Sequence, residues 1–476
     1  MAQRRIRFSA ADGPAVAAAF SELRENLDVA LGFPDEVLAD ADESARSPRL
    51  PDADETGIAF VTIDPPDSQD LDQALHVERR GEGFRVRYAI ADVAAFVRPG
   101  GLMDREAHTR GETLYAPDRN ACLYPAAIAE DAGSLLPDEP RPALVWTMDV
   151  DSTGEGVAVE VKRALVRSKA KLDYAAVQRS LDDGTADEPL LLLREVGLLR
   201  QERERRLSGI DLPIPEQQIE LRPEGFELSF RAPLPVERWN AQVSLLTGQA
   251  AAELMLEARV GVLRTLPKAD DGAVARLRRS ADALGVRWPE ELSYAEFIRG
   301  LDPGVPMHAA VLVESTVLLR GSGYAAFDGQ APREPKHAGV GAPYAHATAP
   351  LRRLVDRYVG EVCVAVCAGA EVPDWARAAL PGLPETMERS NRRAQQYEAG
   401  ILSTIEAAVL EDSVGHVFDA VVVEVDDDEA RGVVQLIAPA VTARCEGELP
   451  LGERVRVRLT LADVAERRVR FELAEI

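Results

Sequence analysis

The spacing of apolar residues divides the chain into strand-like and helix-like stretches. Short apolar runs bounded by turn residues predict strands at 58–63, 74–77, 84–90, 144–150 and 157–166. Apolar residues at steps of mostly three or four predict two long helices, at 241–263 and 385–410. Because strands and helices alternate, we expect a mixed α/β domain over residues 51–411.

The two ends of the chain follow different patterns. Pro14 suits a first helical position, and apolar residues then recur at helical spacing as far as Leu31. With a second helix expected at 36–41, residues 1–50 are predicted to form a small helical module, which we suggest is helix-turn-helix-like. Residues 412–476 instead predict an all-β OB-fold barrel, because five short β-rich runs follow one another at 417–425, 432–437, 441–445, 454–461 and 469–473.

Composition limits the class of protein. A chain of 476 residues suggests about three domains, and 46% hydrophobic with 28% charged residues is ordinary for a globular protein. The chain has no run of 18 apolar residues and its first residues lack an apolar signal core, so we expect a cytoplasmic protein without membrane contact. The four cysteines form no Cys-x-x-Cys pair, which fits a reducing compartment.

The charge balance restricts how the chain could bind nucleic acid. A net charge of −25 argues against non-specific binding over the whole surface, so the necessary cations would have to be concentrated locally. Arg454, Arg456 and Arg458 alternate with apolar residues in a predicted strand, which would place their side chains on one face of the barrel. An ordinary solvated barrel exterior is the alternative explanation.

A cluster of carboxylates follows the first predicted strand. Asp64, Asp67, Asp70 and Asp72 lie within nine residues, and no Lys or Arg occurs from Pro51 to Val77. In extended chain Asp70 and Asp72 point the same way, and like charges so close repel unless a cation neutralises them. Clustered carboxylate oxygens suit Mg²⁺ or Mn²⁺. From the spacing alone, a metal site and a solvated acidic loop are about equally good explanations.

Five sequence blocks together resemble the ribonuclease II family of 3′-to-5′ exoribonucleases. The family pattern of Asp, five residues, and Asp-Leu-Asp-Asp is met by Asp64, Asp70 and Asp72, with Gln73 in place of the fourth Asp. The other blocks follow in the family's order at 88–100, 104–117, 168–174 and 344–353. A lone Asp cluster would be a weak signal, whereas five ordered blocks are a highly specific one.

The resemblance implies a fold and an activity. It implies a mixed α/β catalytic domain, preceded here by the small helical module and followed by an RNA-binding OB-fold barrel. The implied activity is metal-dependent, processive 3′-to-5′ hydrolysis of single-stranded RNA to nucleoside 5′-monophosphates, by a monomer that needs no nucleotide cofactor. Asp64, Asp70 and Asp72 would hold two Mg²⁺ or Mn²⁺ ions with substrate bound, and Asp72 would be the most rate-sensitive of the three.

Further site residues come from the same resemblance. Arg352 matches the arginine that stabilises the transition state, and its alternative role is a salt bridge to Asp356 one helical turn away. Tyr115 matches an aromatic that stacks on terminal bases, although a half-buried core tyrosine would look the same. Arg353 and Arg357 are weaker candidates for contacts along an RNA channel.

Other functions remain open at this stage. Gln73 carries no charge, which would weaken a metal site and is compatible with an RNA-binding regulator that has lost its nuclease activity. An exonuclease acting on DNA would differ only in its contacts to the sugar. Residues 1–50 are a candidate RNA entry clamp, because they stand where well-known family members carry cold-shock domains.

Overall fold

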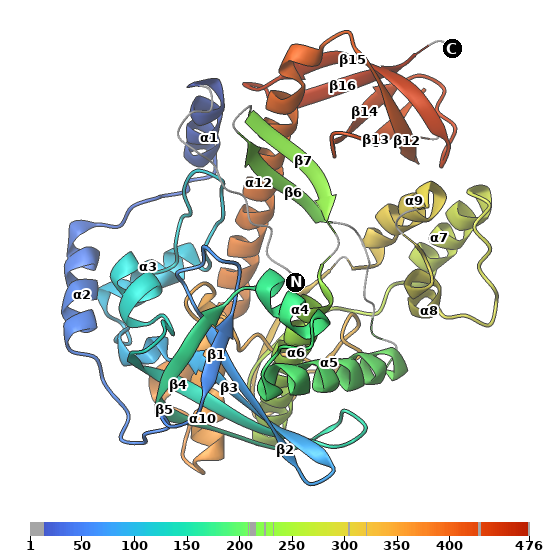
Figure 1. Ribbon diagram of the computed structural model, residues 1–476. Coiled ribbons are helices and arrows are strands. Elements are labelled where there is room, and N and C mark those ends of the chain that lie inside the picture. Colours follow the sequence, from blue (N-terminus) through green and yellow to red (C-terminus); the bar gives the residue numbers. More distant parts are fainter. Residues whose placement is uncertain are drawn as a thin grey trace.

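The computed structural model describes residues 14–207, 209, 216–222, 225–231, 233–302, 305–319, 321–426 and 430–474. Two closed five-stranded barrels lie at opposite ends of the described structure, and helices connect them (Figure 1). The mixed α/β class predicted from the sequence is confirmed.

The first barrel contains the strands predicted between residues 58 and 166. They are β1 (Phe60–Ile63), β2 (Gln73–Arg80), β3 (Gly83–Ala91), β4 (Pro140–Val150) and β5 (Gly156–Leu172). Neighbouring strands pair antiparallel, and β1 closes the barrel by pairing parallel with β5, with Phe60 opposite Ser168. The sequence pattern predicted the strands but contained no sign of this closure.

Helices cover the first barrel. These are α5 (Glu188–Arg206), α6 (Pro235–Ala258) and α10 (Leu354–Cys367), and each packs against at least one of its strands. The helix predicted over 241–263 ends earlier than expected, so its C-terminal boundary was wrong. Arg259 adopts a left-handed conformation with φ 58°, and the chain continues as β8 (Val260–Thr265), which pairs with β9 (Gly323–Asp328).

The remaining helices and strands connect these parts. The helices are α3 (Leu102–Arg110), α4 (Tyr174–Asp182), α7 (Asp271–Ala283), α8 (Tyr294–Arg299), α9 (Pro306–Ser315), α11 (Asp374–Ala379), η1 (Val93–Ala95), η2 (Ala127–Ala132), η3 (Thr316–Leu319), η4 (Leu380–Gly382) and η5 (Glu411–Ser413). Two hairpins are formed by β6 (Glu216–Arg222) with β7 (Gly225–Arg231) and by β10 (Lys336–His337) with β11 (Ala342–Pro343). The long helix α12 (Leu383–Leu410) leads from the α/β region to the second barrel, as expected for 385–410 (Figure 1).

The N-terminal helices lie on the α/β region. The first, α1 (Pro14–Asn26), packs against α12, and the second, α2 (Asp35–Arg46), packs against α3. Arg110 fastens the segment between them by donating to the Ala30 carbonyl at 2.9 Å and lying 3.8 Å from the Phe33 ring centre. Both predicted helices are present, while the boundaries at 50/51 and 411/412 stay a prediction.

The second barrel has the strands predicted from the sequence. They are β12 (Val417–Val425), β13 (Arg431–Leu436), β14 (Thr442–Glu446), β15 (Arg454–Asp463) and β16 (Arg468–Leu473), in the order β12-β13-β14-β16-β15. The predicted OB-type barrel is thereby confirmed. None of the helices in the described ranges has the length and apolar character needed to span a membrane.

Candidate active site

The acidic segment forms the connection between β1 and β2 at one end of the first barrel. Asp64 directly follows β1, and its backbone N–H donates to the Leu172 carbonyl at the end of β5 at 3.0 Å. Leu71 is completely buried, and its N–H donates to the Ser134 hydroxyl at 2.9 Å. Its burial fixes the segment, so that Asp70 and Asp72 on either side of it are held in place.

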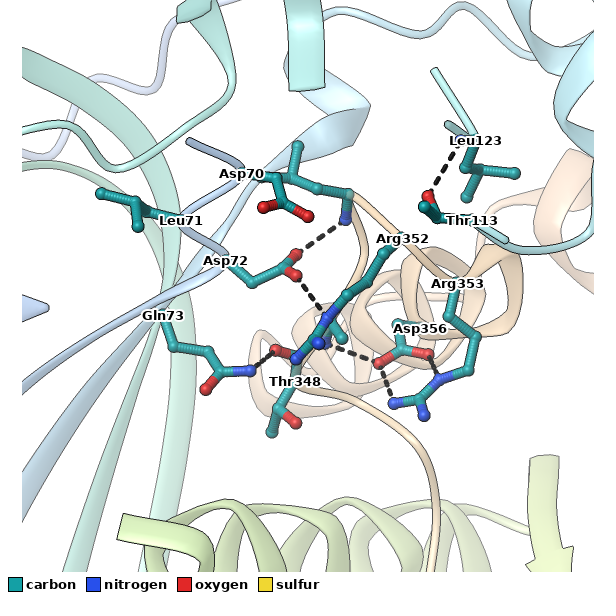
Figure 2. A network of polar contacts seen from close by, with 12 residues as sticks. Asp70, Leu71, Asp72, Gln73, Thr113, Leu123, Thr348, Arg352, Arg353 and Asp356 are labelled. Carbon is teal, nitrogen blue, oxygen red and sulfur yellow. Dashed lines mark hydrogen bonds and ion pairs between the residues drawn. The ribbon is translucent and has the colours of Figure 1, made fainter. Parts of the chain in front are cut away.

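Asp72 lies at the centre of the site. It is 3% exposed, and its Oδ1 accepts a hydrogen bond from the Leu351 N–H at 2.8 Å (Figure 2). Its Oδ2 lies 2.9 Å from Nε of Arg352, but the two groups are not aligned for a hydrogen bond, and within the described residues neither atom has a hydrogen-bond partner. Burial raises the pKa of Asp72 to about 8, although Arg352 opposes the shift; nearby Asp70 adds to it.

These properties fit a carboxylate that holds a cation. A buried oxygen without a hydrogen-bond donor is costly, and a carboxyl group with a raised pKa binds a proton unless a cation competes for the site. Asp70 lies beside Asp72 in Figure 2, so two carboxylates are available at this position. The pair can therefore contribute ligands to a divalent ion.

Asp64 does not join this pair in a ready-made metal site. Among the residues that the structure describes, no group of three or more His, Cys, Asp and Glu side chains is arranged to hold a metal ion. Asp64 instead influences Tyr174, whose pKa is raised to about 12 by burial and, to a smaller extent, by this carboxylate. The structure thus brings together Asp70 and Asp72, and metal ligation by Asp64 stays a prediction.

Tyr115 lies beside Asp70. Its hydroxyl donates to Asp70 Oδ2 at 3.4 Å, and its side chain is half-buried. The ring therefore stands next to the acidic pair, where the sequence analysis expected a base-stacking residue. Stacking on RNA by Tyr115 stays a prediction.

The segment that carries Arg352 and Arg353 is a turn and not the first turn of a helix. The alternative salt bridge of Arg352 with Asp356 one turn away requires a helix that already includes Arg352, but α10 begins at Leu354, with Arg353 as its N-cap residue. Arg353 forms the ion pair with Asp356, at 2.5 Å between Nε and Oδ2, whereas Arg352 faces Asp72. The alternative salt bridge between Arg352 and Asp356 is therefore wrong, and an RNA contact by Arg353 stays a prediction.

Arg357 needs a correction. Its side chain is 1% exposed and pairs with Asp104 at 2.6 Å, and it also donates to the Val97 carbonyl at 3.1 Å. Its guanidinium lies 4.8 Å from the ring centre of Trp375. A phosphate cannot reach a group buried in this way, so Arg357 stabilises the fold and is not an RNA contact. The sequence analysis missed this because Asp104 is 253 residues away.

The sequence analysis also missed the partners of Gln73. Its Nε2 donates to the Thr348 carbonyl (Figure 2). Its Oε1 accepts from the Tyr88 hydroxyl at 2.7 Å. The Tyr88 hydroxyl lies 2.9 Å from the Ser244 hydroxyl on α6. The available signal was strand register, since Gln73 is opposite Ile90 and Tyr88 is its diagonal neighbour on the same face.

The three arginines of β15 lie on the outside of the second barrel, far along the chain from this site. Arg454, Arg456 and Arg458 are all exposed, as their alternation predicted. Acidic groups are interleaved with them: Arg458 Nε lies 3.6 Å from Glu472 Oε1, and Arg456 is opposite Asp419 in the β12 register. Their contact with RNA stays a prediction.

Sequence comparisons place the chain in a family. The RNB domain matches residues 53–368, and an RNase II-type exonuclease C-terminal S1 domain matches residues 416–474. Because the first match covers more than half of its length, the chain belongs to the RNB-domain family of RNase II-type proteins. The resemblance identified from the five blocks is confirmed. This family generally depends on divalent metals.

Individual relatives agree with this assignment. Ribonuclease R of Escherichia coli is 26% identical over 485 residues, which cover 90% of this chain and 58% of that protein. The chain thus spans less than two thirds of the length of that relative. The structure of Mycoplasma genitalium RNase R in complex with ribose-methylated single-stranded RNA has a TM-score of 0.86 at 17% identity, covering 97% of this chain and 78% of that one. Yeast Ssd1, described as a pseudonuclease, has a TM-score of 0.68 at 17% identity, covering 90% and 53%.

Proposed function

We propose that this protein is a divalent-metal-dependent, processive 3′-to-5′ exoribonuclease that hydrolyses single-stranded RNA to nucleoside 5′-monophosphates. The observation that carries the proposal is the ion pair of buried Asp72 with half-buried Arg352, beside Asp70, within a domain of the RNB family. An enclosed arrangement of carboxylates with one guanidinium suits phosphodiester hydrolysis, where negative charge develops on the phosphate.

Each residue has a proposed part in the reaction. Asp70 and Asp72 would hold Mg²⁺ or Mn²⁺, with Asp64 and the substrate phosphate completing the site for two ions. Bound there, divalent ions would activate the attacking water and offset the charge of the leaving oxygen. Arg352 would leave its pairing with Asp72 to contact the scissile phosphate, and Tyr115 would stack on the 3′-terminal base.

The second barrel would hold RNA further from the site. Arg454, Arg456 and Arg458 supply exposed cations for the RNA backbone. We further propose that the protein acts as a monomer in the cytoplasm without a nucleotide cofactor, which is compatible with four cysteines that form no disulfide.

The test is a hydrolysis assay on a 5′-labelled single-stranded RNA of ~20–30 nucleotides, a length that can reach from a binding barrel into an enclosed site. We expect rapid conversion to a short 5′-labelled product without an intermediate ladder in Mg²⁺ or Mn²⁺, and no conversion in EDTA. A DNA oligonucleotide of the same sequence serves as the sugar control. Turnover that persists in EDTA would contradict the proposal.

A second candidate function has specific support. Gln73 replaces a charged ligand, no three-carboxylate group is ready to hold a metal in the described part of the chain, and the fold resembles that of the pseudonuclease Ssd1. An RNA-binding protein without nuclease activity would combine these features. Tight RNA binding with no cleavage in either metal would favour this candidate over the exoribonuclease.

A further inference from the structure

Gln73 departs from the family pattern, and its contacts differ from those of a metal ligand. Both ends of its amide are engaged within the protein. Nε2 donates to the Thr348 carbonyl and Oε1 accepts from the Tyr88 hydroxyl at 2.7 Å. Since a carbonyl only accepts, the amide orientation is fixed by its partners.

The hydrogen bonds run in one direction. The Tyr88 hydroxyl donates its one hydrogen bond to Gln73, so the Ser244 hydroxyl at 2.9 Å must donate to the Tyr88 oxygen. The series therefore passes from Ser244 on α6 through Tyr88 on β3 and Gln73 on β2 to Thr348. We call these four residues the Gln73 bridge.

The bridge ends on the segment that positions Arg352. The backbone from Thr348 to Arg352 is held at three more points. The Ala349 N–H donates to Asp356 Oδ1 at 2.7 Å, and the Leu351 N–H donates to Asp72 Oδ1 at 2.8 Å. The Arg352 carbonyl accepts from the Thr113 N–H at 2.9 Å. Figure 2 shows Gln73 and Asp72, which are neighbours in sequence, contacting the two ends of this one segment.

We propose that Gln73 is a positioning residue that fixes the 348–352 segment and thereby Arg352, in place of the metal-ligating role of the Asp that the family has at this position. The expected effect of Gln73 on the rate of RNA hydrolysis rests on the proposed function. The expected effect on the 348–352 segment rests on the contacts alone. An Asp at position 73 would be shorter and, when ionised, could only accept hydrogen bonds. This Asp would leave the Thr348 carbonyl without a hydrogen-bond donor, and its carboxylate would face that carbonyl as a second acceptor.

The first measurement is hydrogen exchange of a peptide spanning residues 345–353. In Gln73→Ala we expect its amides to exchange about tenfold faster, because one of the four hydrogen bonds that hold the 348–352 segment is lost. Gln396→Ala, at an exposed position on α12, is the matched control and should exchange like the wild type. Unchanged exchange in Gln73→Ala would overturn the proposal whether or not the protein hydrolyses RNA.

The second measurement separates positioning from metal binding. In Gln73→Ala and Gln73→Asp we expect kcat for RNA hydrolysis to fall by about 10- to 100-fold, because Arg352 is misplaced, while the half-saturating metal concentration stays within about twofold. If Gln73→Asp matched or exceeded wild-type kcat and lowered the half-saturating Mg²⁺ concentration, position 73 would be a ligand position and the proposal would be wrong.

The hydroxyl of Tyr88 gives an independent test. Tyr88→Phe keeps the buried ring and removes the donor to Gln73, so we expect a change in the same direction as in Gln73→Ala but smaller. Tyr358→Phe removes a buried hydroxyl that lies 2.6 Å from Nε2 of His108, outside the bridge, and should leave kcat unchanged. Equal loss in both variants would contradict the bridge. If the wild type does not hydrolyse RNA at all, the proposed function fails, and the exchange experiment alone decides the role of Gln73.

Discussion

The protein contains two closed five-stranded barrels that differ in what surrounds them. All but two residues of β3 in the first barrel are buried, because helices cover its outside. In β15 of the second barrel, Arg454, Arg456 and Arg458 are exposed while Val457 and Leu459 are buried. One barrel is therefore enclosed by protein, and the other has a core inside and solvent outside.

The surroundings decide what charged groups can do. In the first barrel, burial raises the pKa of Asp72 to about 8 and leaves its Oδ2 without a hydrogen bond among the described residues. Charges in such surroundings interact strongly with a few defined partners. The arginines of β15 are in contact with water and salt, so each interacts weakly and over a range limited by screening. A closed five-stranded barrel thus suits chemistry in one case and adjustable binding in the other.

The largest expected effect comes from removing the charge at the enclosed site. Asp72→Asn should lower kcat by at least about 1000-fold, because the carboxylate that would hold the metal is lost. RNA affinity measured in EDTA should stay within a few-fold. Exposed Asp419 on β12 offers the matched control, since Asp419→Asn should retain activity. Near wild-type cutting by Asp72→Asn would show that the site is assigned to the wrong residues.

The next effect concerns the stability of the enclosed region. Arg357→Ala leaves buried Asp104 without its ion-pair partner, and we expect a loss of about 3–5 kcal/mol in the free energy of unfolding. Denaturant unfolding followed by circular dichroism measures this loss. Arg456→Ala, at an exposed position, should change the same quantity by no more than about 0.5 kcal/mol. Similar values for the two variants would remove the distinction between the barrels.

A smaller effect is expected when the charge at Arg352 is kept and its shape is changed. Arg352→Lys should lower kcat by about 10- to 100-fold, because an ammonium lacks the planar donors that bind two phosphate oxygens. Thermal stability should remain close to that of the wild type. Single-turnover hydrolysis at saturating enzyme isolates this step from RNA binding, and full activity of the lysine variant would argue that only charge matters here.

The smallest effect should come from the open barrel. Replacing Arg454, Arg456 and Arg458 together by Glu should raise KM for RNA several-fold and flatten its salt dependence, with kcat within about twofold. Reversal of exposed Arg392 on α12 is the control for general charge effects. A large fall in kcat with unchanged KM would mean that the two barrels do not divide binding and chemistry.

Local pattern was enough for much of this protein. The strands of both barrels were predictable because side chains alternate between the two faces of a strand. Burial of one face or of both therefore produces a regular pattern of apolar residues in the sequence. The same alternation placed Asp70 and Asp72 on one face of the extended chain, with buried Leu71 on the opposite face. The sequence blocks identified the family. These features depend on residues that are close together in the chain.

Tertiary structure decided the contacts across long separations. Asp72 meets the Leu351 N–H over 279 residues, and Gln73 meets Thr348 over 275. Arg353 and Arg357 lie one helical turn apart in sequence, yet Arg353 pairs locally with Asp356 whereas Arg357 is buried against Asp104. Hydrophobic periodicity reports which face of an element is buried but not which partner covers it. The depth of burial, and with it the raised pKa of Asp72 and the hydrogen bonds of Gln73, therefore follows only from how distant segments pack together.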